Sequence, residues 1–315
     1  MHYSSPLPVY VLSRDAKAYA AILRADYLHL INVVSASASP DALAASDIRI
    51  LLGDPDLTAK VIPECDNLLW CQSTWAGNKP ILALTKRDYH LTGVKGIFGR
   101  QMREYVFAYT LHHLRAINDF AERQRAGQWQ HPSFTSLAGK TMGILGAGSI
   151  ANALLPVARA FELNVIGLSR SGKIKNGYAR MYSAKERLAF ASQCDVMVNL
   201  MPDTPDTTHV IDAAFLDALP SHALIINSGR GSAIDDDALI AALDSGSIAA
   251  AVLDVFSEEP LPADHPFWHH KKVTMTMHTA AMSAPEDVLD VFIHNAKRLI
   301  NGQPLHYLFD FDKGY

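Results

Sequence analysis

Three groups of polar side chains follow three successive apolar segments in the second half of the chain. These side chains are Arg230 between two glycines, the carboxylates Asp254 and Glu259, and His278. A guanidinium binds carboxylates through a planar fork, and an imidazole donates protons near neutral pH. A carboxylate bonded to the second ring nitrogen stabilises the protonated imidazole. Together the residue types suit the binding of a keto acid and the reduction of its carbonyl group.

Each of these side chains alone is also consistent with a structural role. The chain has 14 histidines, so a single imidazole is weak evidence for catalysis. Glu258, next to Glu259, is interpreted as a solvated neighbour. The prediction rests on the joint placement of the groups, because ligands of parallel sheets bind at the carboxyl ends of the strands.

Alternating apolar and helix-compatible segments predict the elements that position these groups. Strands are expected at residues 141–145, 164–168, 196–200, 223–227, 249–253 and 273–277. Helices are expected at residues 149–161, 184–191, 213–218, 235–245 and 285–301. Six strands with crossover helices match a doubly wound dinucleotide-binding domain of the Rossmann type.

The first third of the chain predicts a second parallel sheet with helices on its faces. Its strands are expected at residues 9–12, 28–34, 48–52 and 68–71, and its helices at 16–24 and 40–45. One long helix is predicted from Gln101 to Gln128, as a domain connection or a dimer interface. The fold class is therefore α/β with two doubly wound domains. Residues 1–99 with 286–315 are expected to form the substrate domain, and residues 100–285 the dinucleotide-binding domain.

A glycine turn joins a predicted strand to a predicted helix, with the sequence Gly146-Ala-Gly148-Ser149-Ile150-Ala151. Gly146 permits the tight turn, Gly148 lets the backbone approach a pyrophosphate, and Ala151 lets the helix pack on the strand. The free N–H groups of the helix start then face the phosphates. The pattern alone also fits a plain strand–helix turn, but its place between strand and helix predicts dinucleotide binding.

The next strand ends at Leu168, where an acidic residue would hold the ribose 2′-hydroxyl of NAD. The chain instead continues Ser169-Arg170-Ser171-Gly-Lys173. A guanidinium and hydroxyl groups suit a 2′-phosphate, so NADP(H) is predicted as the preferred cofactor and NAD as the alternative. If Arg170 is only a solvated loop residue, this preference has no basis.

Composition excludes several classes of protein. A length of 315 residues with 49% hydrophobic residues supports two domains, and a net charge of −4 gives no reason to expect a nucleic-acid partner. No apolar run is long enough to span a membrane. Residues 1–12 lack a basic region and a long apolar stretch, so we expect no signal peptide and a cytoplasmic location.

The cysteines and histidines do not predict a metal site. Cys65, Cys71 and Cys194 lack metal-ligand spacing and are expected to be free and buried. The histidine pairs at 112–113 and 269–270 are adjacent in sequence, so their side chains point in different directions.

In the order and spacing of these motifs, the sequence resembles the D-isomer-specific 2-hydroxyacid dehydrogenase family. The resemblance covers nearly the whole chain and is strongest from Gly143 to Ala281. The matching stretches are residues 143–151, 202–208, 227–231 with 235–239, 253–262 and 277–281. The resemblance implies a Rossmann-like and a flavodoxin-like domain, a cleft active site and a homodimer. It also implies the NAD(P)-dependent reduction of small 2-keto acids, with glyoxylate and hydroxypyruvate as the expected substrates.

The resemblance implies a role for each candidate residue. Arg230 binds the substrate carboxylate and keto oxygen, His278 is the acid/base, and Glu259 supports its protonated form. Asp254 contacts the nicotinamide side of the cofactor. The substrate-binding residues are Trp75, Ala76, Gly77 and Arg230, the first three in a loop whose N–H groups hold the carboxylate. The cofactor-binding residues are Gly146, Gly148, Ser149, Ile150, Ser169, Arg170, Pro202, Ser228, Arg230, Asp254 and His278.

The chain departs from the family pattern at Ala151, at Met277, where proline is common, and at Asn78-Lys79, where Val-Asp is usual. The last departure bears on the identity of the substrate, because this loop lines the pocket. One alternative is an NAD(P)-binding regulatory or corepressor protein, which need not keep the catalytic trio. Another is a phosphoglycerate or formate dehydrogenase. With the chain ending at Tyr315, no C-terminal regulatory domain is expected, and a formate enzyme needs no general acid.

Overall fold

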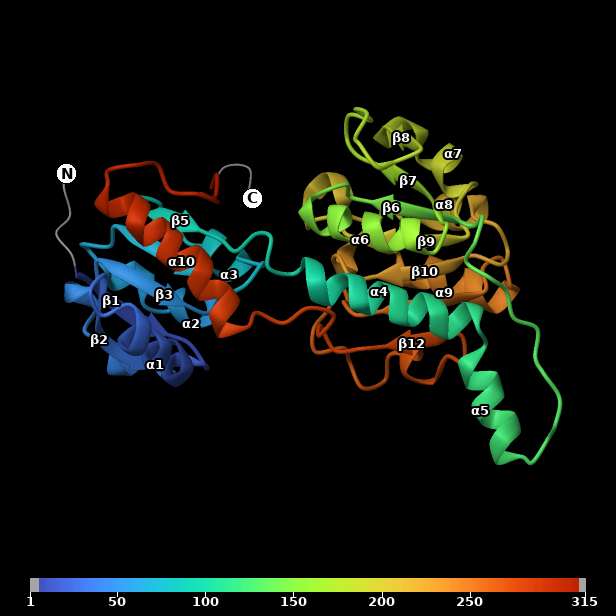
Figure 1. The fold of residues 1–315 in the computed structure, drawn as a ribbon, viewed down its shortest axis with the longest axis horizontal. Coiled ribbons are helices and arrows are strands. Elements are labelled where there is room, and N and C mark those ends of the chain that lie inside the picture. The colour runs from blue at the N-terminus through green and yellow to red at the C-terminus, as the bar shows by residue number, and fades with distance from the viewer. Residues whose placement is uncertain (1–5, 312–315) are drawn as a thin grey trace. The chain divides into compact units, whose positions relative to one another are not determined.

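The computed structural model describes residues 6–311, which divide into two compact units (Figure 1). Unit 1 is Met1–Ile97 with Ser283–Tyr315, and unit 2 is Phe98–Met282. Residues 1–5 and 312–315 lie outside the described part. The predicted substrate domain includes these residues, and residues 1–5 also belong to the segment 1–12 in which we expect no signal peptide, so both predictions lie partly outside the described residues.

Unit 1 contains a five-stranded sheet in the order β2-β1-β3-β4-β5. All neighbouring pairs are parallel, and this order is that of flavodoxin-like folds. The strands are β1 (Leu7–Leu12), β2 (Ile31–Ser37), β3 (Ile50–Gly53), β4 (Trp70–Ser73) and β5 (His90–Thr92). The helices are α1 (Ala16–Asp26), α2 (Pro55–Thr58), α3 (Lys79–Leu82) and α10 (Pro285–Ile300). Helix α10 returns the chain to this unit and stacks Phe292 on Trp70, with ring centroids 4.9 Å apart.

One prediction for unit 1 is wrong, and one strand of its sheet was not predicted. The helix expected at residues 40–45 is replaced by two 3₁₀ turns, Pro40–Ala42 and Ala45–Asp47, neither of which buries a side chain. Without a face to bury, the segment gains little from extending into an α-helix. Strand β5 was not predicted, because it has only three residues and an exposed first position, which leaves no apolar run to recognise.

Unit 2 contains a seven-stranded parallel sheet in the order β12-β11-β10-β9-β6-β7-β8. Its strands are β6 (Thr141–Leu145), β7 (Asn164–Leu168), β8 (Arg180–Tyr182), β9 (Val196–Asn199), β10 (Leu224–Asn227), β11 (Ala250–Leu253) and β12 (Val273–Met275). Successive residues of a strand enter different cores: Leu145 packs into one apolar cluster and Ile144 into the other. Burial on both faces explains why these strands appear in the sequence as continuous apolar runs.

Helices cover this sheet on both faces. They are α4 (Gly99–Leu114), α6 (Ser149–Ala160), α7 (Arg187–Ala191), α8 (Ala213–Ala218) and α9 (Asp236–Ser245), while α5 (Ile117–Arg125) follows α4 without covering the sheet. The helix predicted at 184–191 begins as a 3₁₀ turn, Ala184–Glu186, before α7. Strand β8 adds a seventh strand to the six predicted, and it was missed because it is a three-residue edge strand with one buried side chain.

The single helix predicted from Gln101 to Gln128 is also wrong, because the chain breaks at Ala116. Ala116 has a φ of 51°, in the left-handed region, and separates α4 from α5. Helix α4 buries Met102, Val106 and Phe107, whereas α5 buries no residue and projects from unit 2 (Figure 1). The apolar spacing that predicts a helix therefore covers two helices with different environments.

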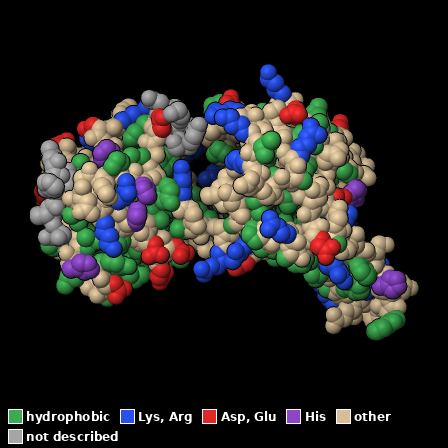
Figure 2. All heavy atoms as spheres, turned by 45° about the horizontal axis from the view of Figure 1, so that its top comes forward, with side chains coloured by type: hydrophobic (Ala, Val, Ile, Leu, Met, Phe, Trp, Pro, Cys, Tyr) green, Lys and Arg blue, Asp and Glu red, His purple; other side chains and the backbone are tan. Residues whose placement is uncertain are grey.

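Other expectations concern the surface and the cysteines. Cys65, Cys71 and Cys194 are buried and free, as predicted. Between residues 6 and 311, none of the helices combines the length and apolar character needed to cross a bilayer. On the face shown in Figure 2, basic and acidic side chains are interspersed on both units.

Candidate active site

The sheet of unit 2 brings the three predicted polar segments to one edge. Strands β10, β11 and β12 are neighbours, with Asn227 paired to Leu253 and Leu253 paired to Met275. The residues that follow these strand ends therefore leave the sheet side by side. This places the Arg230 loop, the Asp254–Glu259 segment and the His278 loop along the carboxyl edge.

His278 and Glu259 form a direct pair at this edge. His278 Nδ1 lies 2.7 Å from Glu259 Oε2, and the Phe256 N–H donates to Glu259 Oε1 at 2.9 Å. The carboxylate is thus fixed by one hydrogen bond on each oxygen. His278 has a φ of 56°, a left-handed conformation that is uncommon outside glycine, and its side chain is half exposed. His278 Nε2 makes no hydrogen bond within residues 6–311, so this second ring nitrogen is free to contact a ligand.

The contact sets the charge of both partners. The hydrogen bond that His278 donates to Glu259, and then the charge of Glu259, raise the pKa of His278, against burial and the positive charge of Arg230, which lower it. For Glu259, burial acts to raise the pKa, but the hydrogen bond to His278 leads the effects that lower it below its ordinary value. The pair therefore favours a protonated imidazole beside an ionised carboxylate.

Two buried asparagines shape the Arg230 loop. Asn199 Nδ2 donates to Asn227 Oδ1 at 2.9 Å, and Asn227 Nδ2 donates to the Arg230 carbonyl at 3.1 Å. A Cβ added at Gly231 would come within 1.8 Å of the Phe256 carbonyl carbon, so this position requires glycine. The loop thereby packs against the segment that carries Glu259. The half-buried Arg230 guanidinium donates to the Gly229 carbonyl at 2.6 Å, and burial lowers its pKa.

Asp254 is almost fully buried directly after β11. One carboxylate oxygen accepts from the Thr276 hydroxyl at 2.5 Å and from the Thr279 N–H at 2.8 Å, and the other accepts from the Ala280 N–H at 3.0 Å. The Asp254 carbonyl also accepts from the His278 N–H at 2.7 Å. These bonds hold the loop that carries His278. The contact of Asp254 with the nicotinamide side of a cofactor stays a prediction.

The glycine turn has the space and the free donors that a dinucleotide requires. Gly146 has a φ of 91°, and a Cβ there would lie 2.9 Å from the Leu200 carbonyl oxygen. A Cβ at Gly148 would meet nothing within 4 Å, which leaves room for a phosphate against the backbone. Ser149 and Ile150 form the first turn of α6, whose N-terminus has no side-chain cap. The residues present therefore fit a pyrophosphate at this helix start.

Two basic side chains, Arg170 and Lys175, lie in the segment that follows β7. The Arg170 side chain is exposed and makes no hydrogen bond or ion pair with other described residues. Ser169 Oγ accepts from the Gly172 N–H at 3.2 Å and shapes the same turn. Lys175 Nζ donates to the Ala147 carbonyl within the glycine turn, which sequence analysis did not anticipate. This end of the site suits an anion such as a 2′-phosphate.

The remaining predicted cofactor residues follow β9 and β10, on the side of the glycine turn away from β7. Pro202 follows β9, next to the Leu200 and Met201 backbone that Gly146 and Gly229 approach. Ser228 is buried, and its hydroxyl has no hydrogen-bond partner within residues 6–311. A buried polar group without a partner calls for a ligand or water, so Ser228 also fits the predicted cofactor site.

Trp75, Ala76 and Gly77 belong to unit 1, where they follow β4. Trp75 and Ala76 are exposed, and the Trp75 N–H donates to Ser73 Oγ at 3.1 Å. The N–H groups of Ala76 and Gly77 make no hydrogen bond to other residues in the described part of the chain. Free N–H groups in an exposed loop are suited to binding a carboxylate.

Sequence analysis missed the residues that hold the site together. Asn199 supports the Arg230 loop from the neighbouring strand β9. The Tyr105 hydroxyl lies 2.8 Å from Thr276 Oγ1, next to Asp254. These side chains resemble ordinary core residues in the sequence. Only the Asn199 side chain carried a signal, since an asparagine at the end of an apolar strand is unusual.

Comparisons with known proteins give consistent results. The family model of the D-isomer specific 2-hydroxyacid dehydrogenase, NAD binding domain, matches residues 107–280, more than half of the chain. A D-isomer specific 2-hydroxyacid dehydrogenase family protein from Aeromonas salmonicida is 36% identical. Its structure matches with a TM-score of 0.91, and the match covers 98% of this chain and 100% of that one.

Two further solved structures hold a nucleotide. The NADPH-dependent glyoxylate/hydroxypyruvate reductase of Sinorhizobium meliloti, in complex with NADP and sulfate, is 29% identical. It has a TM-score of 0.85, with 98% of this chain and 99% of that chain covered. A D-isomer specific 2-hydroxyacid dehydrogenase from Xanthobacter autotrophicus Py2, in complex with NADPH and MES, is 28% identical. Its TM-score is 0.85, with 99% and 100% covered.

Proposed function

The chain belongs to the D-isomer-specific 2-hydroxyacid dehydrogenase family, and on that premise we propose that it reduces glyoxylate and hydroxypyruvate with NADPH. The observation that carries the proposal is the 2.7 Å His278–Glu259 pair, which lies within the electrostatic reach of Arg230. The similarity to a glyoxylate/hydroxypyruvate reductase supports the choice of substrates.

Arg230 binds the substrate in this proposal. Its guanidinium clamps the carboxylate and polarises the keto oxygen, since a planar fork of donors matches two oxygens. The Ala76 and Gly77 N–H groups bind the carboxylate from the loop of unit 1. Because the Gly229–Gly231 turn is packed against neighbouring backbone, the guanidinium is held in place before the substrate arrives.

His278 supplies the proton. The protonated ring donates from Nε2 to the oxygen of the former keto group, which becomes the hydroxyl of the product. Glu259 holds Nδ1 and keeps the ring in the charged form until transfer. Reduction therefore begins from an imidazolium and ends with a neutral imidazole.

NADPH is held by the glycine turn and the end of β7. The N–H groups at the start of α6 bind the pyrophosphate, while Arg170, Ser169 and Lys175 bind the 2′-phosphate. Ser228 and Pro202 line the path between these groups and Arg230. When bound, NADPH supplies the hydride that reduces the keto carbon.

We also propose a homodimer built on the arm formed by α5 and the residues up to 136. Ile117, Phe120, Trp129 and Phe134 are exposed on it, and Trp129 is fully exposed. An apolar surface of this kind is typical of a protein interface. Figure 2 shows apolar side chains at the end of this arm. Light scattering of the wild type and of Trp129→Asp tests the proposal: a dimer that becomes a monomer supports it, and a wild-type monomer contradicts it.

The direct test of the reaction is NADPH oxidation, followed by absorbance, with glyoxylate, hydroxypyruvate and pyruvate. His278→Ala should lower kcat by about a thousandfold while NADPH binding is retained. His29→Ala, an exposed histidine with no hydrogen bond in the described residues, is the matched control. Near-normal turnover of His278→Ala contradicts the assignment of the proton donor. A wild type that binds NADPH but reduces none of the three acids contradicts the proposed substrates.

A further inference from the structure

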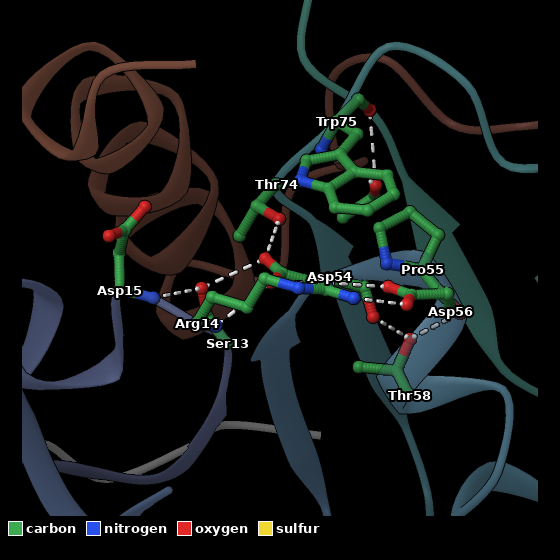
Figure 3. A network of polar contacts seen from close by, with 10 residues as sticks. Ser13, Arg14, Asp15, Asp54, Pro55, Asp56, Thr58, Thr74 and Trp75 are labelled. Atoms are coloured by element: carbon green, nitrogen blue, oxygen red, sulfur yellow. Dashed lines mark hydrogen bonds and ion pairs between the residues drawn. The ribbon is translucent and has the colours of Figure 1, made fainter. Parts of the chain in front are cut away.

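A polar network at the carboxyl edge of the unit 1 sheet surrounds Asp54, which directly follows β3 (Figure 3). One oxygen of this buried carboxylate accepts from the Ser13 hydroxyl at 2.8 Å and from the Thr74 hydroxyl at 2.6 Å. The other accepts from the Arg14 N–H at 2.9 Å and from its guanidinium at 3.2 Å. Asp54 thereby joins the residues that follow β1 to those that follow β4.

Arg14 is held more firmly than a surface arginine needs to be. Its guanidinium donates to both oxygens of Asp56, at 3.0 and 2.6 Å, in addition to Asp54. The side chain is nevertheless 56% exposed, so these ion pairs contribute little to the stability of the fold. A rigid guanidinium on an open surface suggests a task other than stability.

The same guanidinium also contacts the Trp75 side chain. Arg14 Cζ lies 5.4 Å from the centre of the Trp75 ring, within the range of a cation–π contact. Trp75 is the first residue of the loop whose N–H groups are proposed to bind substrate. Figure 3 shows Arg14 extending from Asp54 toward Asp56 below the indole. The two carboxylates therefore fix the guanidinium, and the guanidinium fixes the indole.

Asn78 holds the other side of the same loop. Its Nδ2 lies 3.5 Å from the Trp75 carbonyl oxygen and 3.4 Å from that of Ala76. In a trans peptide the N–H points opposite to the carbonyl. Drawing these two carbonyls toward Asn78 turns the N–H groups of Ala76 and Gly77 away from it. This is the orientation that frees both N–H groups for a ligand.

We propose that Arg14 is a positioning residue for 2-keto acid binding. Asp54 and Asp56 hold its guanidinium, and the guanidinium holds the Trp75 indole in place. Asn78 completes the hold on the loop from the opposite end. The proposal rests on the proposed function, since it assigns Arg14 to the binding of that substrate. The proposal also gives a role to one departure of this chain from the family pattern, because Asn78 stands where valine is usual.

The expected kinetic signature follows from the role of the loop. Its N–H groups contact the carboxylate, which does not change charge during the reaction. The loop therefore binds the substrate and the transition state alike. Loss of such uniform binding raises KM and leaves kcat unchanged. A residue that served stability alone would lower the melting temperature and leave KM unchanged.

The test compares Arg14→Met and Arg14→Lys with the control Arg24→Met, which replaces an exposed arginine on α1 that makes no side-chain hydrogen bond or ion pair in the described residues. Arg14→Met should raise KM for glyoxylate and hydroxypyruvate about tenfold, with kcat within about twofold of the wild type. Arg14→Lys keeps the charge but not the planar fork, so KM should stay raised, and the melting temperatures of both Arg14 variants should lie close to that of the wild type. Affinity for NADPH should be unchanged in all variants.

A double-mutant cycle with Trp75→Leu identifies the route of the effect. If Arg14 acts through Trp75, the double variant should have the same KM as Trp75→Leu alone. Additive effects, or a wild-type KM in Arg14→Met, contradict the positioning role. These results differ from a failure of the proposed function, in which the wild type itself reduces none of the keto acids and the role of Arg14 falls with it.

Discussion

Each of the two sheets has a buried aspartate that holds the loops at its carboxyl edge, and the two aspartates differ in the groups that donate to them. This difference matches the proposed roles of the two edges, which are catalysis in unit 2 and substrate binding in unit 1. In each unit a buried aspartate directly follows a strand and holds the neighbouring loops: Asp54 after β3 and Asp254 after β11. Asp254 secures the loop that carries His278. Asp54 secures the segment that leads to Trp75.

The donors differ in kind. Asp254 accepts from a fixed backbone N–H on each oxygen, so it determines the path of the main chain around His278. One oxygen of Asp54 accepts from two hydroxyls, which can rotate, and the other accepts from the backbone N–H and the guanidinium of Arg14. The unit 2 edge therefore holds a strained backbone rigidly, as proton transfer requires. The unit 1 edge holds its loop through side chains, which can change between related proteins with their substrates.

If chemistry belongs to the unit 2 edge, Arg230→Lys should have an effect as large as that of His278→Ala. Lysine keeps the charge but loses the planar fork, so kcat/KM should fall about a thousandfold. The expected loss lies mainly in kcat, in contrast to the KM effect at Arg14. Steady-state kinetics measure it, with Arg159→Lys, an exposed arginine of α6, as the control. A variant that changes only KM would remove the distinction between the two edges.

The Glu259–His278 pair gives the next largest effect and a pH dependence. Glu259 raises the pKa of His278 above its ordinary value of 6.5. The proton donor is therefore present below that raised pKa, and kcat/KM for reduction should decline as pH rises through it. Glu259→Gln removes the main cause, so the decline should move to lower pH, with kcat reduced about a hundredfold.

Rate profiles between pH 5 and pH 9 test this prediction. Glu258→Gln, which removes the adjacent exposed carboxylate, is the matched control and should keep the wild-type profile. A Glu259→Gln profile with an unchanged alkaline decline would mean that another group donates the proton.

The sequence predicted the unit 2 edge far better than the unit 1 edge, for a physical reason. Gly146, Arg230 and His278 are each signalled by a local pattern next to a buried strand. The contacts of Arg14 with Asp54 and Asp56 join residues about 40 positions apart, and nothing local marks them. Elements without an apolar run were also missed, as β5 and β8 show. The break at Ala116 was missed because the apolar spacing continues across it.

The two aspartates themselves provide the next comparison. In Asp254→Asn the new amide nitrogen must face the N–H of either Thr279 or Ala280, and neither N–H can accept a hydrogen bond. In Asp54→Asn the amide nitrogen can donate to the Ser13 and Thr74 hydroxyls, which rotate to accept. Asp254→Asn should therefore lower the free energy of unfolding by about 2 kcal/mol, and Asp54→Asn by about 1 kcal/mol. Urea unfolding of the two variants measures the difference, and the reverse order would contradict this account of the donors.

Arg170 tests whether cofactor recognition also belongs to unit 2, and its kinetic effect should be smaller than those of Arg230 and Glu259. Arg170→Ala removes one cation from the proposed 2′-phosphate site, but Ser169 and Lys175 remain, so KM for NADPH should rise only about tenfold. KM for NADH should stay the same, because NADH has no phosphate at that position. Arg159→Ala is the control, and both cofactors are assayed with the same keto acid. An equal rise for NADPH and NADH would mean that Arg170 supports the fold of the turn and does not recognise the phosphate.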